Sequence, residues 1–103
     1  MRAPVAPPTD DVATRAQLIR ALADPTRLRV LDLLGEDGPR CHCELEAALD
    51  VPANRLSFHL RVLREAGLVG TSRRGRRVDY HLEPNAMAAV RAALPSDAGM
   101  VSS

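Results

Sequence analysis

Two cysteines, Cys41 and Cys43, lie one residue apart at the start of a segment with helical periodicity. Thiolates are soft ligands that favour ions such as Zn(II), Cd(II), Pb(II), Sb(III) and As(III), and a helix N-terminus favours the thiolate by lowering the thiol pKa. Positions i and i+2 of an ideal helix point about 200° apart, so one ion reaches both sulfurs only if the first turn distorts. A structural disulfide is not expected in a reducing cytosol. The spacing predicts a two-thiolate ion site or a redox-active thiol pair; in the alternative, Cys41 extends the apolar face of the helix and Cys43 is inert.

Arginine provides the second pattern that could do chemistry. All 14 basic residues are arginine, and the formal net charge of +1 hides an uneven distribution. Residues 52–82 hold seven arginines against two acids, a net of +5, whereas residues 1–51 hold six arginines against nine acids, a net of −3. A basic block of this kind predicts a surface that binds phosphate groups.

Length and composition limit the fold that positions these residues. With 103 residues and 46% apolar content, the chain is long enough for one compact domain. Its only aromatic residues are Phe58 and Tyr80, so a core of Leu, Val and Ala favours packed helices. We expect a disordered leader at 1–12, one domain at 13–94 and a flexible tail at 95–103. The sequence shows neither an apolar run that spans a membrane nor the apolar core of a signal peptide, so a cytoplasmic protein is expected.

Apolar periodicity predicts five helices, at residues 13–23, 25–34, 41–49, 54–66 and 83–94. Asp24 is the expected N-cap of the second helix, and Gly67 is the expected left-handed C-cap of the fourth. The third and fourth helices form a helix-turn-helix, and alternating residues around the "RRGRR" tip predict a two-stranded β-hairpin with Gly75 in its turn. The expected buried stripe of the second helix is either Leu28, Leu31 and Leu34 or Val30 and Leu34. The expected buried positions of the third and fourth helices are Leu45, Ala48 and Leu49, and Leu56, Leu60 and Leu63. The fold class is therefore mainly α, a winged helix-turn-helix with five helices and a two-stranded wing.

A winged helix-turn-helix binds double-stranded DNA with two separate parts. Its second helix enters the major groove, and the arginines of its wing contact phosphates or the minor groove. The outward positions of that helix are Asn54, Arg55, Ser57, Phe58 and Arg61, with His59 at the boundary of the two faces. The wing candidates are Arg73, Arg74, Arg76 and Arg77, and Arg64 is placed for a backbone contact.

Four segments, "ALADPTRLRVLDLL", "CHCELEAAL", "LSFHLRVLREAGLV" and "RRGRRVDYHL", resemble the successive signature segments of the ArsR/SmtB metal-responsive repressors. The resemblance covers about residues 16–94. It implies an elongated homodimer that is joined by its first and last helices. Such a dimer clamps a palindromic operator and releases it when an inducer binds, so two recognition helices related by a twofold axis would read two half-sites.

The same resemblance implies an inducer site at a Cys-x-Cys in the third helix, which Cys41 and Cys43 match. Arsenic-type members commonly have a third cysteine three residues after the second, where this chain has Glu46. The third ligand is therefore open between hydroxide, His42, Glu46 and a side chain of the partner subunit, while a monomethyl arsenical needs only two thiolates. The family's other site, a His- and carboxylate-bearing cluster on the last helix, has no match in residues 83–94.

Together these patterns predict a metal(loid)-responsive transcriptional repressor without an organic cofactor. Its inducer is As(III) or another thiophilic ion bound by Cys41 and Cys43. Where the family commonly has a His, this chain has Phe58, which either contacts a thymine methyl group or turns inward. The alternatives are a redox-responsive winged-helix repressor and a winged-helix protein-interaction module without DNA binding. An enzyme is not predicted, because the sequence lacks a nucleophile with its base and orienting group, and it lacks a phosphate loop.

Overall fold

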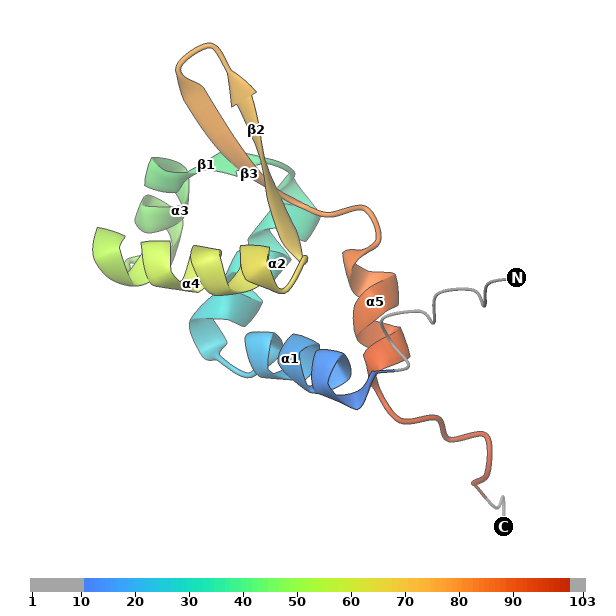
Figure 1. The fold of residues 1–103 in the computed structure, drawn as a ribbon. Helices are drawn as coiled ribbons and strands as arrows, with labels where there is room; N and C mark the ends of the chain where they lie inside the picture. The colour runs from blue at the N-terminus through green and yellow to red at the C-terminus, as the bar shows by residue number, and fades with distance from the viewer. Residues whose placement is uncertain (1–10, 101–103) are drawn as a thin grey trace.

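The computed structural model describes residues 11–100, and the predicted leader up to residue 10 lies outside them. Figure 1 shows five helices and a small antiparallel sheet, which confirms the mainly α winged helix-turn-helix class. The elements are α1 (Val12–Leu22), α2 (Pro25–Asp37), β1 (Arg40–Cys41), α3 (His42–Leu49), α4 (Ala53–Glu65), β2 (Val69–Arg74), β3 (Arg77–Leu82) and α5 (Ala86–Ala93).

The sheet corrects one sequence-based prediction, because it has three strands in the order β1-β3-β2 rather than two. The extra strand, β1, pairs Cys41 with Asp79 and Arg40 with Tyr80. A strand of two residues has no periodicity that sequence patterns can detect. Cys41 was predicted to be the first residue of the third helix, but it is the last residue of β1.

Local sequence signals fix the start of α2, the end of α4 and the turn of the wing. The Asp24 carboxylate accepts a hydrogen bond from the Arg27 amide at 3.1 Å, and Pro25 occupies the first turn of α2. Gly67 follows α4 with φ of 79°, and Gly75 turns the wing with φ of 61°, both in the left-handed region that favours glycine. Gly67 thus lies in the short connection between the end of α4 at Glu65 and the start of β2 at Val69, and Gly75 lies between β2 and β3.

Leucines from the first four helices form most of the core, together with Leu68 and with Val69 at the start of β2. Leu45, Leu49, Leu56, Leu60 and Leu63 are buried as predicted, and Val30, Leu31 and Leu34 form the buried face of α2. Of the two stripes predicted for α2, the one with Val30 and Leu34 is fully buried, whereas Leu28 of the other is 48% exposed. The prediction that Ala48 is buried is wrong, because Ala48 is exposed.

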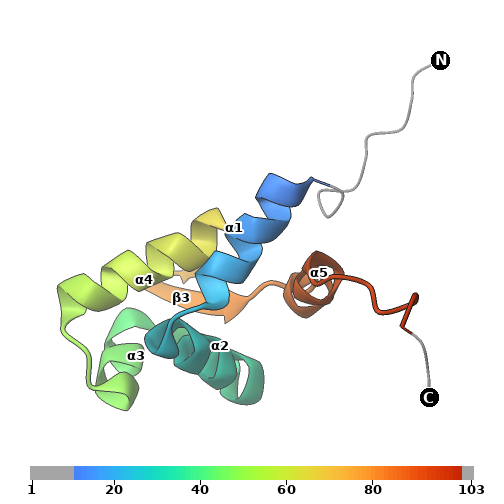
Figure 2. The ribbon, with the colours of Figure 1, turned by 90° about the horizontal axis from the view of Figure 1, so that it is seen from below.

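The wing and the terminal helices lie at different ends of the molecule. In Figure 1 the β2–β3 hairpin projects at the top, whereas α1 lies at the bottom beside α5; Figure 2 shows α1 and α5 from below. The Arg15 side chain joins these two helices by donating a hydrogen bond to the Ala93 carbonyl at 3.1 Å. Within the described residues, no helix combines the length and apolar character needed to cross a bilayer.

Candidate dithiol site and nucleic-acid interface

The two thiols meet directly at the junction of β1 and α3. Cys41 is the N-cap of α3, with extended backbone at φ −77° and ψ 167°, and its Sγ lies 2.9 Å from the Sγ of Cys43. The 200° separation of an ideal helix does not apply, because Cys41 has not entered the helix. The prediction that the first turn must distort before both sulfurs reach one ion is therefore wrong.

The thiol pair also differs electrostatically from the prediction. The pKa of Cys43 is raised, first by its contact with the Cys41 thiol, then by partial desolvation and by the charge of Cys41. A helix N-terminus alone would lower it. Two adjacent sulfurs hold a shared proton better than two negative charges, so an ion that binds here must displace protons.

The two side chains of this chain that were predicted as possible third ligands, His42 and Glu46, contact each other, and His42 also contacts Ser57. His42 Nδ1 lies 2.6 Å from Glu46 Oε2, and His42 Nε2 lies 3.0 Å from the Ser57 hydroxyl on α4. Within residues 11–100, no three His, Cys, Asp or Glu side chains cluster closely enough to hold a metal ion. Of the predicted ligands, the structure brings the two thiols into contact with each other and pairs His42 with Glu46.

A shallow hollow of about 560 Å³ lies over the thiols, between the start of α3 and the wing. An ion can reach the sulfurs from solvent through this hollow, since Cys43 is exposed. Its lining residues are Cys41, His42, Cys43, Glu46, Arg76, Arg77 and Val78.

Glu44 connects the thiol site to the wing. Its Oε1 accepts hydrogen bonds from the Cys41 amide at 3.0 Å and from the Arg77 guanidinium at 2.8 Å. The pKa of Glu44 is lowered, mainly by the Cys41 amide. Arg77 also donates to the buried Asp79 carboxylate at 2.7 Å, and this pairing raises the pKa of Arg77. Sequence reasoning missed Glu44, although a glutamate three residues after an N-cap is the spacing of a capping box.

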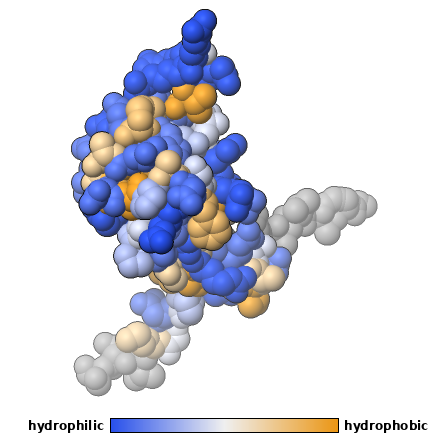
Figure 3. Space-filling view, turned by 90° about the vertical axis from the view of Figure 1, so that its left-hand side faces the viewer, coloured by the Kyte–Doolittle hydropathy of each residue, from blue (hydrophilic) through white to orange (hydrophobic). Residues whose placement is uncertain are grey.

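The recognition face of α4 is open. The predicted outward residues Asn54, Arg55, Ser57, Phe58 and Arg61 are all exposed. The Phe58 side chain is 47% exposed and does not turn inward, and the Arg61 guanidinium carbon lies 5.7 Å from the centre of its ring. Figure 3 views the side of the molecule that carries α3 and the start of α4, and the wing tip stands out there as a hydrophilic projection.

His59 does not share this face, which corrects its prediction at the boundary of α4. It is only 7% exposed, and its Nδ1 accepts a hydrogen bond from Arg27 at 2.9 Å. The pKa of His59 is lowered because burial disfavours the imidazolium, and the Arg27 charge adds to this while Asp24 opposes it. A neutral His59 joins α4 to α2 and is not available to DNA.

Comparison with known proteins agrees with this arrangement. Residues 24–71 match the family model described as "Bacterial regulatory protein, arsR family". A solved structure titled "Crystal structure of Possible transcriptional regulator for arsenical resistance" is 38% identical, with a TM-score of 0.67, and the match covers 74% of this chain and 78% of that one. This chain belongs to the ArsR family.

Two curated relatives of this ArsR-family chain are named as repressors. The "Arsenical resistance operon repressor" of Escherichia coli is 45% identical over 69 residues, 67% of this chain and 59% of the relative. The "HTH-type transcriptional repressor SmtB" of Mycobacterium tuberculosis is 40% identical over 85 residues, 82% of this chain and 62% of the relative. The matched part thus spans about three fifths of each relative's length.

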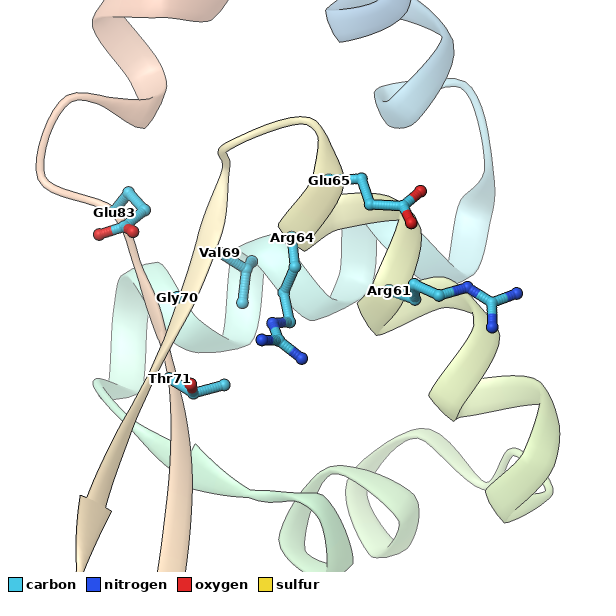
Figure 4. A pocket seen from close by; sticks show the side chains of 7 residues that line it. All are labelled: Arg61, Arg64, Glu65, Val69, Gly70, Thr71 and Glu83. Carbon is cyan, nitrogen blue, oxygen red and sulfur yellow. The ribbon is translucent and has the colours of Figure 1, made fainter.

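A second hollow, of about 450 Å³, lies between α4 and β2 of this ArsR-family fold (Figure 4). Arg64 points into it toward Thr71, and Arg61 extends away from it along the outer side of α4. A Cβ on Gly70 would lie 2.6 Å from the Glu83 carboxylate and 2.8 Å from the His81 ring, so only glycine fits there without moving these side chains. Arg64 thus lies in the space between α4 and β2.

Proposed function

We propose that this chain is a repressor that binds operator DNA as a homodimer and releases it when As(III) or another thiophilic ion binds Cys41 and Cys43. The observation that carries the proposal is the 2.9 Å contact between the two thiols at the start of α3, in the unit that holds the recognition helix. The names of the arsenical-resistance and SmtB relatives support the same function. Such a regulator acts in the cytoplasm, where its DNA lies.

The DNA-binding part of the proposal rests on exposed positive charge. Arg55 and Arg61 project from α4, and Arg73, Arg74 and Arg76 project from the wing. In this assignment α4 reads base edges in the major groove, and the wing arginines hold phosphates. Arg77 is proposed as a weaker contact, because Glu44 and Asp79 already hold its guanidinium.

We propose that the first and last helices of the 13–94 domain, α1 and α5, form the interface of the dimer. α1 and α5 lie side by side, and they leave large apolar side chains exposed, among them Val12, Ile19 and Leu94. Burial of these groups against a second copy releases water from apolar surface. A twofold axis at this end of the molecule sets two α4 helices at two operator half-sites.

The chemistry of ion capture needs only two sulfurs. Arsenous acid, As(OH)₃, reacts with two thiols to form two As–S bonds and releases two water molecules, so one hydroxide stays on arsenic. Sb(III) follows the same reaction, and a monomethyl arsenical keeps its carbon in place of that hydroxide. Cd(II), Pb(II) and Zn(II) bind the two thiolates after two protons leave, with water in the open positions.

A second candidate, a redox switch, is favoured by the same thiol contact. A peroxide could take two electrons and two protons from the pair and leave a disulfide and water. This candidate predicts operator release by peroxide alone and its reversal by a reductant. The third alternative, a protein-interaction module, predicts no DNA binding at all.

The test is fluorescence anisotropy of a labelled duplex from upstream of the gene, titrated with reduced protein. As(III), Sb(III), Cd(II), Pb(II) and Zn(II) are then added separately, and peroxide is added to a metal-free sample. Release by at least one ion, with an affinity loss of about tenfold to a hundredfold, is expected. Release by peroxide only would replace the ion with the redox switch, and absence of binding would remove the repressor.

A further inference from the structure

His42 occupies a special position, because it lies between the two thiols in sequence and contacts the recognition helix in space. Its Nε2 lies 3.0 Å from the hydroxyl of Ser57, which belongs to the exposed face of α4. Its Nδ1 lies 2.6 Å from Glu46, one turn further along α3. The edge of the ring also faces Tyr80 of β3, with 6.4 Å between ring centres.

The protons in this arrangement follow from the chemistry of the partners. A carboxylate only accepts hydrogen bonds, so Nδ1–H donates to Glu46. In the neutral imidazole, Nε2 then carries the lone pair and accepts the O–H of Ser57. Both ring nitrogens are thereby occupied, and the imidazole forms a fixed bridge from α3 to α4.

Ion binding changes the separation of the two sulfurs that flank this bridge in sequence. Two sulfurs that each lie about 2.3 Å from one tetrahedral ion are about 3.8 Å apart. The free thiols are 2.9 Å apart, so the sulfurs separate by roughly 0.9 Å when such an ion enters. His42 is the only residue between Cys41 and Cys43, so any adjustment of the backbone between the two sulfurs includes it.

We propose that His42 is a positioning residue that transmits ion binding at Cys41 and Cys43 to the recognition helix through its hydrogen bond to Ser57. His42 is not an ion ligand in this account. The inference rests on the proposed function and adds the route by which the thiol site acts on DNA. The proposal assigns the transmission to the hydrogen bond of Nε2, which joins α3 to Ser57 on α4. It assigns none to the hydrogen bond of Nδ1, which joins His42 to Glu46 within α3.

Two amide variants separate these bonds. In His42→Gln the amide reaches the place of Nε2 and retains the contact with Ser57, whereas in His42→Asn it reaches only the place of Nδ1 and retains the contact with Glu46. For each variant, Cd(II) affinity is measured from the thiolate-to-metal absorbance. The release factor of each variant is the ratio of its own operator affinity without Cd(II) to its operator affinity with Cd(II).

We expect both variants to bind Cd(II) within about threefold of the wild type. The wild type should have a release factor of about a hundred, and the Gln variant should retain most of it. The release factor of the Asn variant should be at least about tenfold lower than that of the wild type. Adding Ser57→Ala to the Asn variant should reduce the factor no further, because both changes break the same bond.

Equal release by the Asn variant and the wild type would overturn the proposal. A loss of Cd(II) affinity greater than tenfold in either variant would also overturn it, because His42 would then be a ligand. Failure of the wild type to release DNA with any ion would instead contradict the proposed function, so the two failures are distinct.

Discussion

The start of α3 and the face formed by α4 and the wing differ in how their polar groups find partners. At the start of α3, each thiol contacts the other, His42 bonds to Glu46 and Ser57, and Glu44 bonds to Arg77. On the face formed by α4 and the wing, by contrast, no ion pair with a carboxylate of residues 11–100 is formed by Arg55, Arg61, Arg73 or Arg76.

This difference separates the two binding events. DNA phosphates can occupy arginines that lack internal partners, so DNA affinity should rise with each contact and fall with salt. An ion at the thiols must replace contacts that already exist, so its binding changes the geometry of neighbouring elements. The closed region is therefore suited to regulation and the open region to recognition.

The largest expected effect comes from the open face. Replacing Arg73 and Arg76 by Ala removes up to four phosphate contacts from a dimer, and each contact contributes about 0.9 to the slope of log affinity against log salt. We expect the slope to fall by about 3.6 and the operator affinity at 0.1 M salt to fall on the order of a thousandfold. Anisotropy titrations between 0.05 and about 0.3 M salt measure both quantities.

Arg29 on α2 provides the matched control, because it is exposed and lies outside α4 and the wing. Arg29→Ala should leave the slope within about one unit of the wild type. Equal slopes for the wing double variant and the wild type would remove the wing from the DNA interface.

A smaller effect distinguishes Arg77 from its neighbours in the wing. Arg77→Ala leaves Asp79, which is 4% exposed, without its 2.7 Å partner, so we expect the free energy of unfolding to fall by about 1–3 kcal/mol. Arg74→Ala is the comparison, because Arg74 is 78% exposed and lies 3.8 Å from the same carboxylate. Urea unfolding of both variants measures the difference, and equal loss in the two would contradict the anchoring role of Arg77.

The smallest predicted effect concerns pH and the closed side of α4. The lowered pKa of His59 means that the unfolded chain binds its proton more readily than the folded chain. The contribution of neutral His59 is fully present above its unfolded pKa of about 6.5 and is lost as the pH falls through the lower folded value. His59→Asn keeps an acceptor for Arg27 but does not titrate.

Urea unfolding at about pH 7.5 and pH 5.5 tests this sign, on either side of the unfolded pKa of histidine. The wild type should lose more of its free energy of unfolding than His59→Asn between these two pH values. A variant that loses as much stability as the wild type would show that His59 does not cause the pH dependence.

Local signals in the sequence were sufficient for most of the fold. Asp24 with Pro25, and the glycines Gly67 and Gly75, mark a helix start, a helix end and a turn through their own conformational preferences. The helical periodicity of α4 correctly separated buried Leu56 from the exposed Asn54.

The site was less predictable because it depends on contacts between distant residues. Cys41 leaves α3 because it pairs with Asp79, and Glu44 meets Arg77 across 33 positions of sequence. His59 is buried because Arg27 from α2 reaches it. Helical periodicity describes one element at a time, so it could identify the thiols and arginines but could not show which of them are already engaged.

The central claim is that an ion at the thiol pair releases the operator. The most direct measurement compares the wild type with the Cys41→Ser/Cys43→Ser variant, each first bound to the labelled operator and then titrated with As(III) under reducing conditions. The account predicts release of the wild type and an unchanged anisotropy for the variant at every As(III) concentration. Release of the variant at the same As(III) concentration as the wild type would contradict it.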